Sequence, residues 1–148
     1  MLKIALGSDH GGLALKQEIF KYLHAVGYEV VDCGTNSSES CHYPIYGMAV
    51  AQLVANRECD FGIVVCTTGE GICMAANKVK GVRCGIAYND EVAELMRKHN
   101  DANVIAFGAK FMKTFDVIKR IEIFLHTEFE GGRHQVRVDM LSEIESRK

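Results

Sequence analysis

The sequence lacks several features that mark common functional classes. It contains no tryptophan, one proline and no run of basic residues, and its net charge is −2. Without a basic patch, neither nucleic acid nor an anionic membrane is an expected partner. The apolar run near the amino terminus, residues 4–8 at its most generous, is too short for a signal peptide or a membrane span. We therefore expect a cytoplasmic protein.

Metal-ligand spacing is also absent from the sequence. The six cysteines form no Cys-x-x-Cys pair, and Cys41-His42 is one adjacent pair with no second pair to complete four ligands. The cysteines are spread through predicted strands, turns and helix starts, as expected of reduced thiols in a cytosolic protein. We expect neither disulfides nor a bound metal.

Length and patterning predict an α/β fold. A chain of 148 residues with 48% hydrophobic and 24% charged content suits one buried core, so we expect a single domain, residues 1–148. Short apolar runs alternate with amphipathic helical stretches, which indicates βαβ units and one doubly wound (Rossmann-like) parallel sheet of about five strands, with helices on both faces. The strands are expected at 3–7, 28–31, 63–65, 82–87 and 104–107, each followed by a helix, the last two of these at 91–99 and 114–128, and the tail ends helically.

The chain changes from strand to helix across a turn that is rich in hydroxyls and glycine. Ile63 to Val65 is a β-branched run typical of a strand covered on both faces, and Cys66 stands at its carboxyl end. The amides that open the next helix have no partner within it, so a small anion or a developing oxyanion fits there. The turn consists of Cys66, Thr67, Thr68, Gly69, Glu70 and Gly71.

Three other interpretations of this turn fit less well. A dinucleotide fingerprint would need a third glycine where Met74 stands, and a phosphate P-loop would need a Gly-Lys-Ser/Thr ending, which occurs nowhere in the chain. An inert core cysteine is a common fate of a free thiol. Two hydroxyls and a carboxylate in the four positions after Cys66 argue against that fate.

Asp9 and His10 form a second polar turn, after the first strand. In doubly wound sheets ligands bind beyond the carboxyl ends of the strands, so this turn and residues 66–71 should converge on one cleft. Taken alone, however, Asp9 is better explained as the cap of the first helix.

Two segments later in the chain are equally ambiguous. His99 and Asn100 are consistent with a helix C-terminus, where a cationic histidine and a loop-forming asparagine are routine. Arg133 and Arg137 are consistent with solvated surface charges. If their segment is helical, the i, i+4 spacing places both guanidiniums on one face, where both can reach one anion.

Taken together, these segments resemble the ribose-5-phosphate isomerase B family, which includes the related galactose-6-phosphate and allose-6-phosphate isomerases. The resemblance covers nearly the whole chain, and so many matched blocks in order are highly specific. The blocks are 7–12, 32–35, 43–44, 66–71, 75–78, 99–104, 107–108 and 130–137.

The resemblance implies an aldose–ketose isomerase that interconverts D-ribose 5-phosphate and D-ribulose 5-phosphate through an enediolate, without metal or organic cofactor. A six-carbon aldose 6-phosphate is the alternative substrate. A non-catalytic sugar-phosphate-binding domain is the rival class, although it would not need Cys66 and His99. The family also implies a homodimer or higher homo-oligomer with shared active sites, the His99 region being contributed by the neighbour.

By the same resemblance, Cys66 is the base that takes the C2 proton, and Thr68 with the turn amides to Gly71 stabilises the enediolate oxygens. Asp9 and His99 assist opening of the furanose ring. The remaining substrate contacts that the resemblance implies are His10, Thr67, Gly69, Glu70, Asn100, Lys110, Arg133 and Arg137.

Three of these positions leave the chemistry open. In one branch of the family a carboxylate at the position of Glu70 is the base, and here Cys66 and Glu70 coexist. Glu70 is also consistent with a first-turn carboxylate that interacts with the helix amides. Thr67 replaces a usual glycine, and Lys110 stands where arginine is common, which affects the shape of the pocket and hence the choice of sugar.

Overall fold

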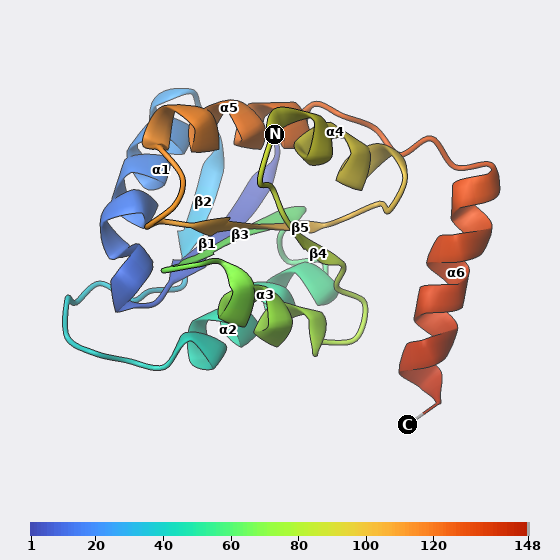
Figure 1. Cartoon of the computed structure of the whole chain (residues 1–148), viewed down its shortest axis with the longest axis horizontal. Helices are drawn as coiled ribbons and strands as arrows, with labels where there is room; N and C mark the ends of the chain where they lie inside the picture. The colour runs from blue at the N-terminus through green and yellow to red at the C-terminus, as the bar shows by residue number, and fades with distance from the viewer. Residues whose placement is uncertain (148) are drawn as a thin grey trace.

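The computed structural model describes residues 1–147, and in that range a five-stranded parallel sheet forms the centre of the fold (Figure 1). Its strand order is β2-β1-β3-β5-β4. The strands are β1 (Lys3–Ser8), β2 (Glu29–Asp32), β3 (Phe61–Cys66), β4 (Cys84–Ile86) and β5 (Val104–Gly108). The helices are α1 (Leu13–Ala25), α2 (Tyr43–Ala55), α3 (Glu70–Asn77), α4 (Asp90–Lys98), α5 (Thr114–Leu125) and α6 (Arg133–Ser146), with a 3-10 helix η1 (His10–Gly12) before α1.

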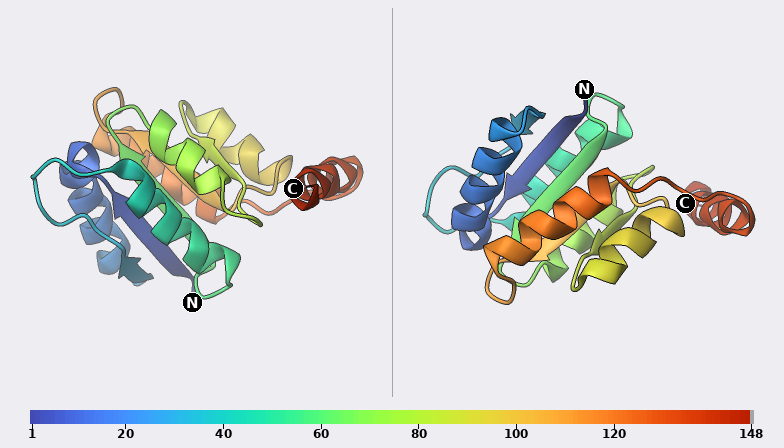
Figure 2. Two further views of the ribbon diagram at one scale, coloured as in Figure 1. Left: turned by 90° about the horizontal axis from the view of Figure 1, so that it is seen from below. Right: turned by 90° about the horizontal axis from the view of Figure 1, so that it is seen from above.

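Helices cover both faces of the sheet. One layer is made by α1, α4 and α5 and the other by α2 and α3 (Figures 1 and 2). Because side chains alternate along a strand, Ile4 and Leu6 of β1 join the core beneath the first layer and Ala5 joins the core beneath the second. Cys66 belongs to the second core. The predicted doubly wound α/β fold is confirmed.

The strand order places the topological switch point of the sheet between β1 and β3. The sheet is extended in one direction from β1 and in the other from β3, so the connections diverge at this pair of strands. Ligands of doubly wound sheets bind at such a point, outside the carboxyl ends of the strands. Ser8 pairs with Val65 at the end of this ladder, so the turns that follow the two strands begin side by side.

Two elements, β4 and α5, are shorter than expected. The edge strand β4 covers Cys84–Ile86 instead of 82–87, because the Arg83 amide donates to the Asn103 side chain, 2.8 Å away, rather than to a strand. On its outer side, Asn77 accepts from the Cys84 amide and donates to the Cys84 carbonyl. Helix α5 ends at Leu125 rather than 128. Beyond its end, the carbonyl of Thr127 accepts a hydrogen bond from the Arg97 side chain.

Helix α6 stands beside the layers rather than within them (Figures 1 and 2). Its buried residues are His134 and Val138. At its far end, Glu145 accepts from the amide of Gly81. Four of its apolar side chains are exposed: Val136, Met140, Leu141 and Ile144.

None of the helices within residues 1–147 has both the length and the apolar character needed to cross a bilayer.

Candidate active site

Cys66 lies at the carboxyl end of β3, directly below the first turn of α3. Its side chain is buried, and its Sγ accepts a hydrogen bond from the amide of Gly69 at 3.1 Å. Gly69 has φ +84°, and a Cβ atom there would lie 2.9 Å from the carbonyl carbon of Phe107. A glycine is therefore required at this position, both for the backbone angle and for the close contact with β5.

Thr68 and the loop after β5 complete the turn. The Thr68 hydroxyl accepts from the amide of Glu70 at 3.1 Å, and Glu70 is exposed at the start of α3. The carbonyls of Cys66 and Thr67 accept from the amides of Ala109 and Lys110, at 2.9 and 3.1 Å. These bonds hold the loop after β5 against the turn, and they place Lys110 at the same edge of the sheet.

Asp9 and His10 lie next to this turn, as predicted. The Asp9 carboxylate is buried and accepts from the amide of Gly12 at 3.2 Å, so it caps η1 rather than α1 itself. His10 Nδ1 accepts from the amide of Cys41 at 3.2 Å, which leaves the proton of a neutral ring on Nε2. His10 Nε2 can therefore donate a hydrogen bond to a ligand.

A buried ion pair that the sequence analysis did not predict supports this edge. Lys16 is 1% exposed, and its Nζ lies 2.7 Å from both oxygens of Asp32 and 2.9 Å from Asn36 Oδ1. Asp32 also accepts from the amide of Gly34, whose carbonyl accepts from the amide of Ser8. The pair thus holds the loop after β2 beside the residue that precedes Asp9. A lysine next to Leu15 on the buried face of α1 was the signal that could have revealed it.

His99 and Asn100 lie at the edge of the sheet formed by the amino ends of the strands, opposite the edge formed by their carboxyl ends, where Cys66 lies. They precede β5, and the carbonyl of Asn103 accepts from the amide of Gly62 at the start of the β3–β5 ladder. That ladder ends with Cys66 beside Gly108. At about 3.3 Å per residue, its five residues span roughly 15 Å. Within one chain, His99 and Cys66 therefore face opposite edges of the sheet.

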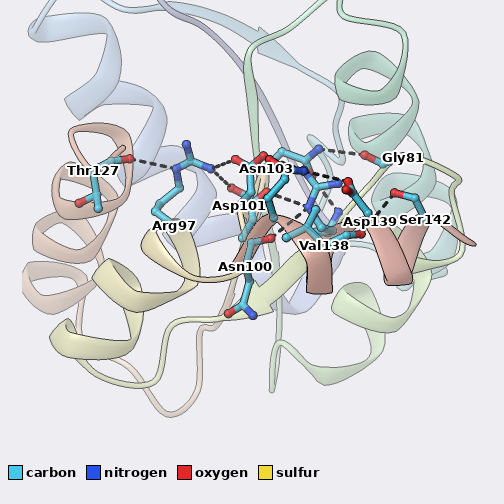
Figure 3. Close-up of polar contacts among 12 residues, drawn as sticks. Gly81, Arg97, Asn100, Asp101, Asn103, Thr127, Val138, Asp139 and Ser142 are labelled. Carbon is cyan, nitrogen blue, oxygen red and sulfur yellow. Dashed lines mark hydrogen bonds and ion pairs between the residues drawn. The ribbon is translucent and has the colours of Figure 1, made fainter. Parts of the chain in front are cut away.

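The segment that carries His99 and Asn100 is held by polar contacts (Figure 3). Arg97 donates to the Asp101 carboxylate at 2.8 Å and to the Thr127 carbonyl at 3.1 Å. Asn103 donates to the carbonyl of Gly81 at 2.9 Å. The carbonyl of Asn100 accepts from Arg83 at 3.1 Å. These bonds fix the backbone on which the two predicted residues stand.

Arg133 and Arg137 accompany His99 at this edge. Both occupy the first turns of α6, so the helical spacing that brings them to one face is present, and both are exposed. His134, between them, stacks on His99 with ring centroids 4.2 Å apart. Burial lowers the pKa of His134, and the charges of His99 and Arg133 lower it further. His134 was not predicted from the sequence, although its position between the two arginines pointed to it.

The predicted site residues thus form two groups. Asp9, His10, residues 66–71 and Lys110 lie at the carboxyl edge. His99, Asn100, Arg133 and Arg137 lie at the other edge. A groove of about 710 Å³ adjoins the first group and is lined in part by Thr68, Glu70, Tyr88 and Phe111. A separate cavity of about 410 Å³ lies between α6 and β4 and includes Asn100 but not Cys66.

The chain is similar to known isomerases over its whole length. A sequence model of the family described as Ribose/Galactose Isomerase matches residues 4–141. Ribose-5-phosphate isomerase B of Escherichia coli K12 is 45% identical over 148 residues, covering 100% of this chain and 99% of that protein. Among solved structures, ribose-5-phosphate isomerase B of Clostridium thermocellum has a TM-score of 0.97 and 46% identity, covering 99% of each chain. The enzyme from Mycoplasma genitalium, solved with bound ribulose-5-phosphate, has a TM-score of 0.94 and 40% identity, covering 99% of this chain and 97% of that one.

Proposed function

Since this chain belongs to the ribose/galactose isomerase family, we propose that it interconverts D-ribose 5-phosphate and D-ribulose 5-phosphate, with Cys66 as the base. It is an aldose–ketose isomerase, and its substrate is a sugar phosphate. The observation that carries the assignment of Cys66 is the hydrogen bond from the Gly69 amide to its sulfur, at the edge where Asp9 and His10 also lie.

The reaction moves one proton between adjacent carbons. The Cys66 thiolate removes the proton from C2 of the open-chain aldose, the C1–C2 double bond forms, and negative charge develops on O1. Return of the proton to C1 and transfer of the O2 proton to O1 complete the ketose, so no oxidant or reductant is consumed. In this role the sulfur keeps the hydrogen bond that the Gly69 amide donates to it, at the amino end of α3.

The developing oxyanion requires hydrogen-bond donors at the same turn. The Thr68 hydroxyl and the amides that open α3 lie within a few residues of Cys66 on a backbone packed against β5. Donors held in place in this way need no reorganisation as charge develops. This arrangement supports Thr68 and residues 69–71 as the stabilising group.

We infer that the second group of residues reaches the substrate from a neighbouring subunit of a homodimer or higher homo-oligomer. A distance of roughly 15 Å separates the two edges within one chain, too far for His99 and Cys66 to act on one sugar. Exposed apolar side chains that such an assembly would cover are present on α6 and on α2–α3. They are Val136, Met140, Leu141 and Ile144 on α6, and Tyr43, Ile45, Met48 and Met74 on the other pair.

In this assembly one set of polar groups would bind the phosphate of the substrate, and another would act on its sugar ring. His10 at the carboxyl edge, with the partner's Arg133 and Arg137, would bind the phosphate. The partner's His99, with Asp9, would transfer protons as the furanose ring opens. The enzyme's six free thiols support a reducing, cytoplasmic location.

A direct assay of purified protein tests the proposal. Turnover of ribose 5-phosphate should exceed that of allose 6-phosphate and galactose 6-phosphate in kcat/KM. Preference for either six-carbon sugar would move the assignment within the family, and binding without turnover of all three would support the non-catalytic alternative. Thr67 packs against Gly11 in the crevice, so Thr67→Gly is the variant to compare if the preference is weak.

A further inference from the structure

Three side chains capable of binding a metal meet between α4 and α6. The ligand atoms of His99, Glu130 and His134 all lie within 4.8 Å of one another. Glu130 Oε1 is 3.9 Å from His99 Nε2 and 3.6 Å from His134 Nε2. Ligands that bind tetrahedral Zn²⁺ at about 2.0–2.2 Å are separated by roughly 3.4 Å. The two measured separations therefore need to shorten by only a few tenths of an ångström.

His134 provides a second, independent observation. Its side chain is 6% exposed, and its Nε2 has no hydrogen-bond partner within residues 1–147. Buried polar atoms without a partner are rare, because leaving water without a replacement interaction costs free energy. This atom is directed toward Glu130, at a distance longer than a hydrogen bond. A cation between the two would satisfy both.

The backbone holds the three residues together. The amide of Glu130 donates to the carbonyl of Lys98 at 3.1 Å, which places Glu130 beside His99. The amide of His99 donates to the carbonyl of Leu95 at 2.8 Å, so its backbone is held at the C-cap of α4. The amide of His134 donates to Gly131 at 3.1 Å in the turn that opens α6.

One side chain must turn for a metal to bind. The two imidazoles are stacked within 14° of parallel, whereas a metal lies in the plane of each ring that ligates it. The His99 side chain is 38% exposed. Its Nε2 is 3.9 Å from Glu130, longer than a hydrogen bond, so within the described residues the ring can rotate without breaking that kind of contact. His134 is buried and would stay in place.

We propose that His99, Glu130 and His134 form a binding site for a borderline divalent transition-metal ion such as Zn²⁺. Two imidazoles and one carboxylate suit this class, whereas Mg²⁺ and Ca²⁺ prefer oxygen ligands alone. Three protein ligands leave the fourth position for water. The charges of Arg133 and Arg137 oppose a cation, so the site binds less tightly than a closed structural zinc site.

The metal would act as an inhibitor of isomerisation. A ligated His99 has no free nitrogen lone pair with which to accept a proton in ring opening. This consequence, unlike the binding itself, rests on the proposed function. Direct binding measurements therefore distinguish failure of the metal site from failure of the isomerase assignment.

The full-length protein is titrated with Co²⁺, whose absorption reports its ligands, and with Zn²⁺ in competition with a chromogenic chelator. One equivalent per chain should bind, with weak visible bands and without the thiolate charge-transfer band that any of the six cysteines would produce. Glu130→Gln and His134→Gln should each weaken binding by at least about 100-fold, since even outer-shell changes cost about 10–100-fold.

His126→Gln is the matched control. His126 Nδ1 lies 3.3 Å from Glu122, but residues 1–147 supply no third ligand there, so metal affinity should be unchanged. Glu130 is half exposed, and Glu130→Gln should keep a native circular dichroism spectrum. Three results would each overturn the proposed site. They are an unchanged metal affinity in folded Glu130→Gln, a thiolate charge-transfer band from the bound Co²⁺, and no metal binding by the wild type. Stoichiometric Zn²⁺ should also inhibit sugar-phosphate turnover in the wild type and not in Glu130→Gln.

Discussion

The amide of Gly69 donates a hydrogen bond to Cys66 Sγ over 3.1 Å, at the point where α3 begins. A helix amide at this position has no intrahelical partner, and a thiolate accepts such a bond more strongly than a neutral thiol. Glu70 is the other candidate base, and it is exposed on the first turn of the same helix. The two assignments differ in what each substitution should do.

Cys66→Ala should lower kcat by about 100-fold to 10,000-fold, the range expected for loss of a general base. Glu70→Gln should keep substantial activity, because its carboxylate is then only part of the pocket wall. Steady-state kinetics with ribose 5-phosphate measures both. A nearly normal rate in Cys66→Ala with a dead Glu70→Gln enzyme would assign the base to Glu70.

Mixing two inactive variants should restore activity if sites are shared between subunits. Random co-assembly of Cys66→Ala and His99→Ala chains makes half of the dimers mixed, and each mixed dimer has one intact site. The expected rate is about a quarter of wild type. Differently tagged chains allow the mixed dimer to be purified, and absence of activity in that species would contradict the shared site.

Arg137→Ala should reduce kcat/KM for the phosphorylated sugar by roughly 10-fold to 100-fold, since a charge-assisted hydrogen bond contributes about 1.5–3 kcal/mol. The thermal midpoint should barely move, because Arg137 is exposed. Arg147→Ala, an exposed arginine at the other end of α6, is the control and should leave kcat/KM unchanged. Equal effects of the two substitutions would argue for bulk charge instead of a phosphate contact.

Lys16→Met should destabilise the fold by about 2–3 kcal/mol. It removes the buried member of an ion pair and leaves Asp32, which is 27% exposed and can regain some water, so the loss falls below the about 3–5 kcal/mol of fully buried pairs. Lys21→Met on the same helix breaks only an exposed pair with Glu18 and should change stability by less than about 1 kcal/mol. Urea unfolding of both variants compares them directly.

Cys73 should react with iodoacetamide faster than Cys33. A hydrogen bond with Cys84 lowers the pKa of the Cys73 thiol, whereas burial raises the pKa of Cys33 to about 11. At a given pH, the lower pKa leaves the larger fraction as reactive thiolate. Peptide mapping after brief labelling at neutral pH measures which of the two cysteines is labelled first. Labelling of Cys33 before Cys73 would contradict this prediction. In the same experiment, substrate should protect Cys66 from labelling.

The sequence was sufficient for the sheet and for the group of residues around Cys66. The β-branched run before Cys66 and the polar turn after it follow the local rules that end a buried strand. Asp9 was predictable for the same reason, because parallel strands present their carboxyl ends at one edge. These inferences depend only on neighbours in the chain and on the direction of the strands.

What the sequence could not reveal depends on contacts between distant segments. His99 and His134 stack although 35 positions separate them in the numbering, and no local pattern announces that contact. The short β4 reflects side chains of Asn77 and Asn103 that replace strand partners. The placement of α6 outside the layers was equally hidden, since its apolar residues have ordinary helical spacing.

The paired bonds between Asn77 and Cys84 have a consequence for solubility. A free sheet edge is a template on which other chains can add strands and aggregate. Here the Asn77 side chain accepts a hydrogen bond from the backbone N–H of Cys84 at 2.8 Å and donates one to the backbone carbonyl of Cys84 at 2.9 Å, much as a neighbouring strand would. Because β4 has only three residues, this single asparagine occupies much of the exposed edge. Self-association through this end of the sheet is thereby disfavoured.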